Sequence, residues 1–294
     1  MNKNRLKNAR HPMEIPLTII SILFTLAFYS IISTLCVKAA TDQESLSNLM
    51  EILDADSSVV ESLIKLGSWA IVAILIYIII YIIYIDKVFI GKTSSESTRL
   101  IDSKYSDIND TFNDYCKKLD IKKIPLVYIE NSYTNSSFLG IKIRSDNAVS
   151  IDQSELRSAE RDNDYDRVKY LLARRISHIY LGHNNLFIIV LSFVGKLVPI
   201  FNNLYERAMC YSADKVVEYL LGEENTLKGI YYTFYNDEMY DDETNFNKIV
   251  KDKIRTENNS ESIGRFLENL LADDPLPAYR LDALLGKGKN GRLF

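Results

Sequence analysis

Histidine and cysteine are scarce in this chain of 294 residues, which has three of each. The cysteines, Cys36, Cys116 and Cys210, are far apart and odd in number. This spacing excludes the disulfide framework of a small secreted protein and is typical of a main domain in a reducing compartment.

An excess of positive charge is also missing. The chain has 35 Lys and Arg residues against 39 Asp and Glu residues, which gives a formal net charge of −4 and a pI near 5.6. A nucleic-acid-binding surface needs clustered positive charge to pair with phosphates. We therefore expect no nucleic-acid partner. Internal repeats and long low-complexity segments are absent from the sequence as well.

Two apolar segments, residues 16–37 and 66–85, lack charged residues altogether. Each is close to the roughly 20 residues that a helix needs to cross the hydrocarbon of a bilayer. A cleavable signal peptide has a shorter apolar core, so the first segment is too long to be one. We predict two transmembrane helices, with buried core helices as the alternative. Residues 1–90 would then form an N-terminal membrane region.

The charges that flank these segments predict their orientation. The connecting loop is acidic, whereas both outer flanks are basic. The outer basic residues are Lys3, Arg5, Lys7 and Arg10 before the first segment, and Lys87, Lys92 and Arg99 after the second. Basic flanks stay on the cytoplasmic side. We expect a multi-pass protein of the cell membrane, with its N-terminus and its main domain in the cytoplasm.

The rest of the chain predicts a mainly helical α+β domain. Residues 91–107 are polar and are expected to form a linker, and residues 108–294 the domain itself. Residues 108–119 have helical spacing, with Ile108, Phe112, Tyr115, Cys116 and Leu119 on one face. Strands are expected within 124–130 and 140–152, and a long helix from an N-cap at Asn163 or Asp164. The apolar segment 186–201 is short for a span, so an interfacial helix, a re-entrant piece and a core helix all remain open.

The stretch ARRISHIYLGHNN, residues 173–185, carries two of the three histidines. A helix that reads His-Glu-x-x-His binds zinc through its two histidines and uses the glutamate as a base. His178 stands at the second histidine of this pattern, but Arg174 and Arg175 occupy the other two positions. A later helix carries R-x-x-C-x-x-A-D, from Arg207 to Asp214.

In their order and spacing these elements resemble the HtpX-type membrane zinc metallopeptidases, which are relatives of the CAAX prenyl proteases. The resemblance covers residues 108–285 and includes IPLVYIENSYTNSSFLG and DDPLPAYRLDALL. It implies a zincin-like (gluzincin) peptidase-type domain with a small sheet beside the site, preceded by a transmembrane helical hairpin.

The resemblance also assigns the positions of the site. The first histidine ligand of the family corresponds to Arg174, the general base to Arg175, and the glutamate ligand to Cys210. His178 keeps the second histidine, and Asp274 stands at a late histidine of the family. The residues that keep the family pattern outside the ligand set are Asp214, Arg207 and Arg280.

These substitutions predict a site that does not catalyse. A catalytic zinc needs three protein ligands and an open position for water, and arginine can neither ligate a metal nor accept a proton. We therefore expect no catalytic residue and no cofactor, with His178, Cys210 and Glu206 as weak metal candidates. His183 lies about 140° around the helix from His178, so we expect the two on different faces, with His183 at the helix end. We expect a buried Arg174 to pair with Asp214 or Glu206.

The function expected on this basis is that of a binding or regulatory pseudopeptidase. Its cleft and sheet edge would take a peptide or protein partner by strand addition without cutting it. The alternative is an active zinc-dependent membrane metalloendopeptidase with a rearranged site, and zinc is expected only in that case. A purely structural membrane anchor for another subunit is a third possibility.

Overall fold

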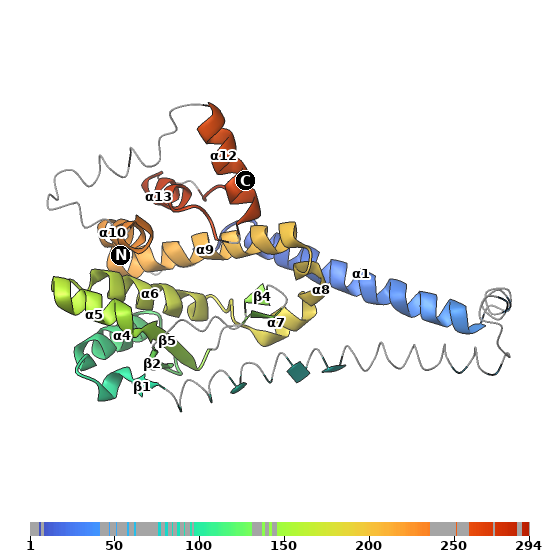
Figure 1. Cartoon of the computed structure of the whole chain (residues 1–294), viewed down its shortest axis with the longest axis horizontal. Coiled ribbons are helices and arrows are strands. Elements are labelled where there is room, and N and C mark those ends of the chain that lie inside the picture. The colour runs from blue at the N-terminus through green and yellow to red at the C-terminus, as the bar shows by residue number, and fades with distance from the viewer. Residues whose placement is uncertain are drawn as a thin grey trace.

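The computed structural model describes residues 9–41, 97–130, 146–235, 259–272, 274–286 and 290–293, two short strands near residue 140, and isolated positions elsewhere. Helices dominate these residues, and the predicted mainly helical fold with a small sheet is confirmed (Figure 1). The second predicted span, residues 66–85, falls outside the described residues except at isolated positions.

The sheet has three strands in the order β1-β2-β5: Thr98–Arg99, Leu126–Glu130 and Ala148–Asp152. β2 pairs in parallel with β5, with Leu126 opposite Ala148, and antiparallel with β1. β1 and the following 3₁₀ helix η2 (Leu100–Asp102) fall within the predicted linker, yet Leu100 is fully buried. A separate two-stranded pair joins β3 (Ser137–Phe138) to β4 (Ile141–Lys142).

The amphipathic helix predicted at residues 108–119 is α4, Ser106–Lys118, and the five apolar residues of its predicted face are all buried. The next boundary differs from the prediction. A further helix, α5 (Gln153–Asp162), ends with Asn163 in the left-handed conformation at φ 51°. Asn163 therefore closes α5, and it is the Asp164 carboxylate that accepts the Asp166 N–H at the start of α6 (Asp166–Tyr180).

The core forms where α6 packs against α9 (Pro199–Leu221) and α10 (Glu223–Tyr235), with α13 (Pro277–Leu285) closing it from the far side (Figure 1). α10 approaches α6 closely because Gly229 has no side chain. A Cβ placed there would lie only 2.3 Å from the Tyr170 ring. Helix α12 (Asn259–Leu271) packs on α9.

The first predicted span is a helix. α1 covers Glu14–Thr41, and its Glu14–Thr34 part is long and apolar enough to cross a membrane, with only 17% of its most apolar window buried. Its N-terminal part packs on α9, α7 (Leu186–Leu191) and α8 (Phe193–Lys196), and the remainder extends beyond them (Figure 1). The apolar segment 186–201 thus breaks into pieces, and none reaches the length of a span.

Candidate functional site

Arg174, Cys210 and Asp274 meet at one position between α6, α9 and the loop before α13. The Arg174 guanidinium donates a hydrogen bond to Cys210 Sγ at 3.2 Å, and the Cys210 thiol donates to Asp274 Oδ1 at 3.1 Å. Arg174 Nη2 lies 3.8 Å from the same Asp274 oxygen. One cation, one neutral donor and one carboxylate thus contact one another at this position, while Arg174 Nε is buried without a hydrogen-bond partner among the described residues.

The thiol of Cys210 is held protonated. Burial, followed by the charge of Asp274, raises its pKa to about 12. A cysteine must lose its proton to bind a metal or to attack a substrate. Cys210 is therefore a hydrogen-bonding group at neutral pH, rather than a ligand or a nucleophile.

A second charged cluster lies deeper in the core. Arg280 of α13 donates two hydrogen bonds to the Asp214 carboxylate of α9, one of them 2.8 Å from Nε to Oδ2, and a third to the Tyr170 hydroxyl of α6. Arg280 is fully buried, and Asp214 nearly so. The prediction that Arg174 would pair with Asp214 or Glu206 is wrong, because Arg280 occupies both oxygens of Asp214 and the ion-pair partner of Arg174 is Asp274.

The two histidines meet at the C-terminal end of α6, and His183 reaches Glu14 at the start of α1. His178 Nδ1 is 2.8 Å from His183 Nδ1, and His183 Nε2 is 3.2 Å from Glu14 Oε1. The prediction that the two histidines lie on different faces is wrong because the helix does not continue to residue 183. α6 ends at Tyr180, Gly182 adopts φ +70°, and the His183 N–H bonds back to the His178 carbonyl at 3.0 Å.

Glu14 ties this histidine pair to the base of α1. Its carboxylate is buried and also accepts hydrogen bonds from the Arg10 guanidinium and the Ser212 hydroxyl of α9. Ser212 in turn accepts the His11 N–H at 2.7 Å. The first turn of the candidate span is therefore fixed to the turn after α6 and to α9 by polar contacts. Sequence reasoning missed this role of Glu14, although a carboxylate at the start of an apolar span is a recognisable signal.

These residues do not fit a zinc ion. Arg174 brings a positive charge to the position where the resemblance predicts the first ligand, Cys210 keeps its proton, and one ring nitrogen of His178 faces His183. Arg175 is half-buried on α6, and Glu206 is buried on α9. Within the described ranges, no group of three His, Cys, Asp or Glu side chains is arranged to hold a metal ion.

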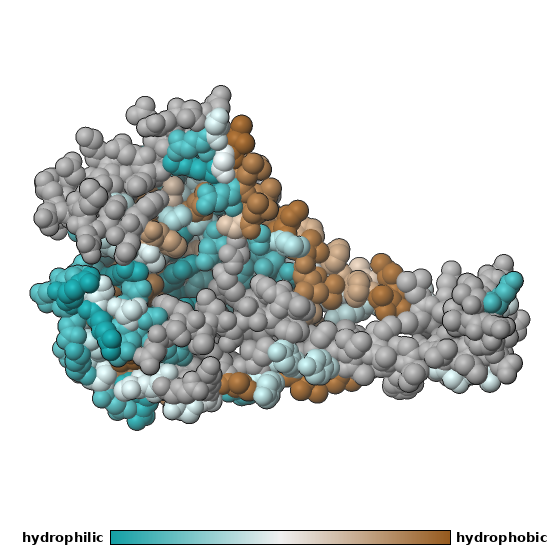
Figure 2. All heavy atoms as spheres, viewed as in Figure 1, coloured by the Kyte–Doolittle hydropathy of each residue, from teal (hydrophilic) through white to brown (hydrophobic). Residues whose placement is uncertain are grey.

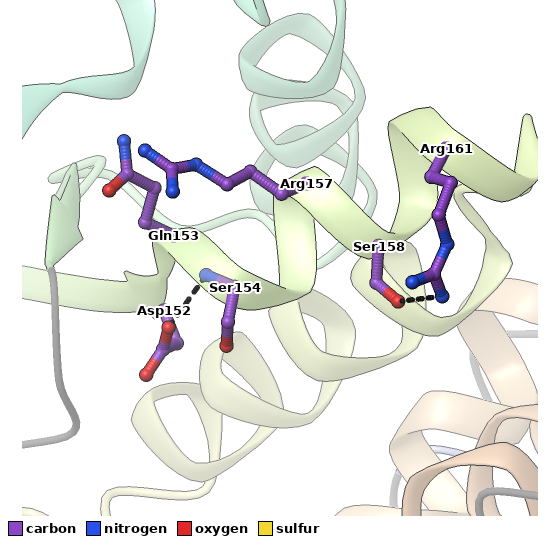
Figure 3. A pocket seen from close by; sticks show the side chains of 6 residues that line it. All are labelled: Asp152, Gln153, Ser154, Arg157, Ser158 and Arg161. Carbon is purple, nitrogen blue, oxygen red and sulfur yellow. Dashed lines mark hydrogen bonds between the residues drawn. The ribbon is translucent and has the colours of Figure 1, made fainter.

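An open hollow lies elsewhere, over α5 (Figure 3). It has a volume of about 380 Å³, and its lining residues are Asp152, Gln153, Ser154, Arg157, Ser158 and Arg161. Two local contacts lie among these residues: Asp152 accepts the Ser154 N–H at 2.7 Å, and Arg161 donates to Ser158 at 3.2 Å. None of the predicted site residues lines this hollow.

Comparison of the chain with protein-family models, with curated proteins and with solved structures gives no match. The family resemblance therefore stays a prediction from the motifs alone.

Proposed function

We propose that the chain is a membrane-anchored pseudopeptidase of the HtpX type, which binds a peptide or protein partner and does not cut it. The contact set of Arg174, Cys210 and Asp274 carries this proposal. The family resemblance assigns Arg174 and Cys210 to metal-ligand positions and Asp274 to a late histidine, and the three side chains lie within 4 Å of one another. A guanidinium neutralised by a carboxylate stands where the family holds a dication.

The charge at this position is the physical reason to favour binding over catalysis. Arginine stays protonated at any physiological pH, so a zinc ion at this position would face an uncompensated repulsion. A missing general base removes a further ~10²–10⁴-fold in rate. The proposed domain is zincin-like, with the partner adding to the sheet at β5, which has a neighbour on one side only in the described sheet.

The proposal places the protein in the cell membrane. α1 is its first span, residues 66–85 its second, and both chain ends lie in the cytoplasm. The apolar, mostly exposed surface of α1 supports the first span, and the basic flanks support the orientation.

Metal analysis of the purified full chain tests the proposal. We expect no stoichiometric zinc in the parent protein. The triple variant Arg174→His, Arg175→Glu, Cys210→Glu restores the family's ligands and base, and we expect it to bind about one zinc per chain. The matched control is Arg157→His with Arg161→Glu, which places the same new residue types at i and i+4 on exposed positions of α5.

Two results would contradict the proposal in different ways. Stoichiometric zinc in the parent, with a proteolytic activity that a chelator abolishes, would identify an active enzyme. A folded triple variant that binds no more zinc than the α5 control would show that the scaffold does not place these positions as the resemblance implies.

A further inference from the structure

Helix α12 carries an apolar face that no part of the described chain covers. Ile263, Phe266, Leu267 and Leu271 are all exposed, and Leu271 retains 79% of its accessible surface. Their spacing of i, i+3, i+4 and i+8 gathers them on one side of the helix. Scattered apolar residues on a surface are ordinary, but a contiguous set of large ones marks an interaction site.

The direction of this face is fixed by contacts on the other side of α12. Asn203 of α9 donates to the Leu271 carbonyl at 2.9 Å, and Arg207 donates to the Leu270 carbonyl at 3.5 Å. Asn269 is fully buried and accepts the Leu276 N–H at 3.2 Å. The helix therefore cannot roll its apolar face into the core without losing these bonds.

The face continues onto the helix that is proposed to cross the membrane. Ile200, in the first turn of α9, and Leu197, just before it, are also exposed. Beyond them lie the exposed apolar residues of α1, which include Ile20, Leu23 and Phe24. Figure 2 shows this surface as a brown margin that runs from α12 past the start of α9 and onto α1.

We propose that the apolar face of α12, together with Leu197 and Ile200, inserts into the interfacial region of the same bilayer that α1 crosses. The proposal depends on the membrane anchoring of α1 stated above and adds a second, non-spanning attachment. An amphipathic helix lies in the membrane plane with its apolar side about 5–10 Å into the headgroup and acyl boundary. Lipid is favoured over a second protein copy because the face is continuous with the lipid-exposed side of α1.

This attachment also positions the candidate site. α12 ends at Leu271, and Asp274, which contacts Arg174 and Cys210, follows three residues later. The bilayer would then hold one end of the short segment that closes the former metal position.

Tryptophan fluorescence tests the insertion directly because the chain has a single Trp, Trp69. In a Trp69→Phe background, Phe266→Trp places the probe on the apolar face and preserves an aromatic side chain. The full chain is reconstituted into phosphatidylcholine vesicles with brominated acyl chains. We expect the brominated lipid to quench the fluorescence of Trp at position 266 roughly twofold or more, because an interfacial helix places its apolar side at the depth of the acyl chains.

Two further variants separate the outcomes. Position 268 lies on an exposed polar side of α12. The fluorescence of Glu268→Trp should therefore be quenched weakly by brominated lipid and readily by acrylamide in water. Phe24→Trp reports on α1. Lipid quenching at position 24 without lipid quenching at position 266 would overturn the insertion of α12 and leave α1 as a membrane span. Protection of position 266 from both quenchers would overturn it in favour of a protein partner. Absence of lipid quenching at both positions would overturn the membrane anchoring itself, and the insertion with it.

Discussion

Single side chains decide the chemistry available to this molecule. Arg174 supplies a permanent positive charge, and Cys210 supplies a thiol that stays protonated. Asp274 accepts a hydrogen bond from the thiol and forms an ion pair with the guanidinium. Four residues along α9 from Cys210, Asp214 belongs to a different cluster and is bound by Arg280. Neighbouring charged groups in this core thus have different hydrogen-bond partners, although the charges of the two clusters still act on each other.

The protonated state of Cys210 predicts its reactivity. With a pKa of about 12, only on the order of 10⁻⁴ of the thiol is ionised at pH 8, so alkylation of the folded protein should be very slow. Asp274→Asn should lower this pKa and accelerate alkylation, because the Asp274 charge is one of the causes of the shift. Peptide mass spectrometry after timed exposure to iodoacetamide measures both rates. Rapid native modification of Cys210 in the parent would contradict the prediction.

The Arg280–Asp214 pair predicts a large loss of stability when it is broken. Asp214→Asn leaves a fully buried guanidinium with its charge uncompensated, which typically costs about 3–5 kcal/mol of unfolding free energy. Arg161→Met, which removes an exposed ion pair with Asp162, should lower the stability far less, because solvent screens an exposed pair. Thermal unfolding of the detergent-solubilised full chain compares the two variants. A similar loss of stability in both variants would show that burial does not make the Arg280–Asp214 pair more important for stability than an exposed pair.

At the scale of elements, close approach between helices depends on glycine at α10. Gly229 faces Tyr170, whose hydroxyl accepts a hydrogen bond from Arg280, so α10 also supports the deeper charged cluster. Gly182 has a different role, because its left-handed conformation turns the chain so that His183 returns to His178. One glycine sets a distance between helices, and the other sets the direction in which a helix ends.

Gly229→Ala should destabilise the protein. The new Cβ would overlap the Tyr170 ring, and forcing extra volume into a packed core costs about 1–3 kcal/mol. Gly264→Ala in α12 is the matched control, since a Cβ there meets no atom within 4 Å. It should instead stabilise the chain by up to about 1 kcal/mol through helix propensity. If Gly229→Ala unfolds at or above the parent temperature, α10 does not approach α6 as closely as described.

For the whole molecule, α1 is both a candidate membrane span and a structural part of the body. Gly195 of α8 lies so close to α1 that an added Cβ would meet the Ser21 carbonyl oxygen at 2.5 Å. Its N–H donates to Thr25 at 3.1 Å, while Glu14 binds His183 and Ser212. Small and polar residues bind the near face of α1 to the body and leave its apolar face outward, where lipid would cover it.

The predicted orientation can be checked in whole cells. A cysteine introduced at Ser47, in the acidic loop, should react with an impermeant maleimide added outside. A cysteine at Ser95, after the second predicted span, should react only after lysis, because basic flanks keep that side in the cytoplasm. The parent protein, with its native cysteines, gives the background. The reverse pattern would exclude the proposed location of the main domain.

Local sequence patterns predicted much of the architecture. The apolar run that begins α1, the buried face of α4 and the alternating β-formers of β2 and β5 all follow from the order of side chains within a few turns. The positions of Arg174, His178 and Cys210 on two helices also followed from spacing. The sequence alone also shows that Arg174 and Arg175 replace residues of the His-Glu-x-x-His pattern. Their effect could be predicted without a structure, because arginine is charged and unable to bind a metal whatever its neighbours are.

The pairing of these side chains was decided only by tertiary structure. Arg174 meets Cys210 across 36 residues, Asp214 meets Arg280 across 66, and His183 meets Glu14 across 169. Several carboxylates were available to each cation, and the choice depends on how α6, α9, α13 and α1 pack. Helix spacing likewise gave the wrong face for His183, because a single left-handed glycine ends the helix before it. Periodicity describes a segment while it continues, whereas long-range contacts depend on where each segment stops and what packs against it.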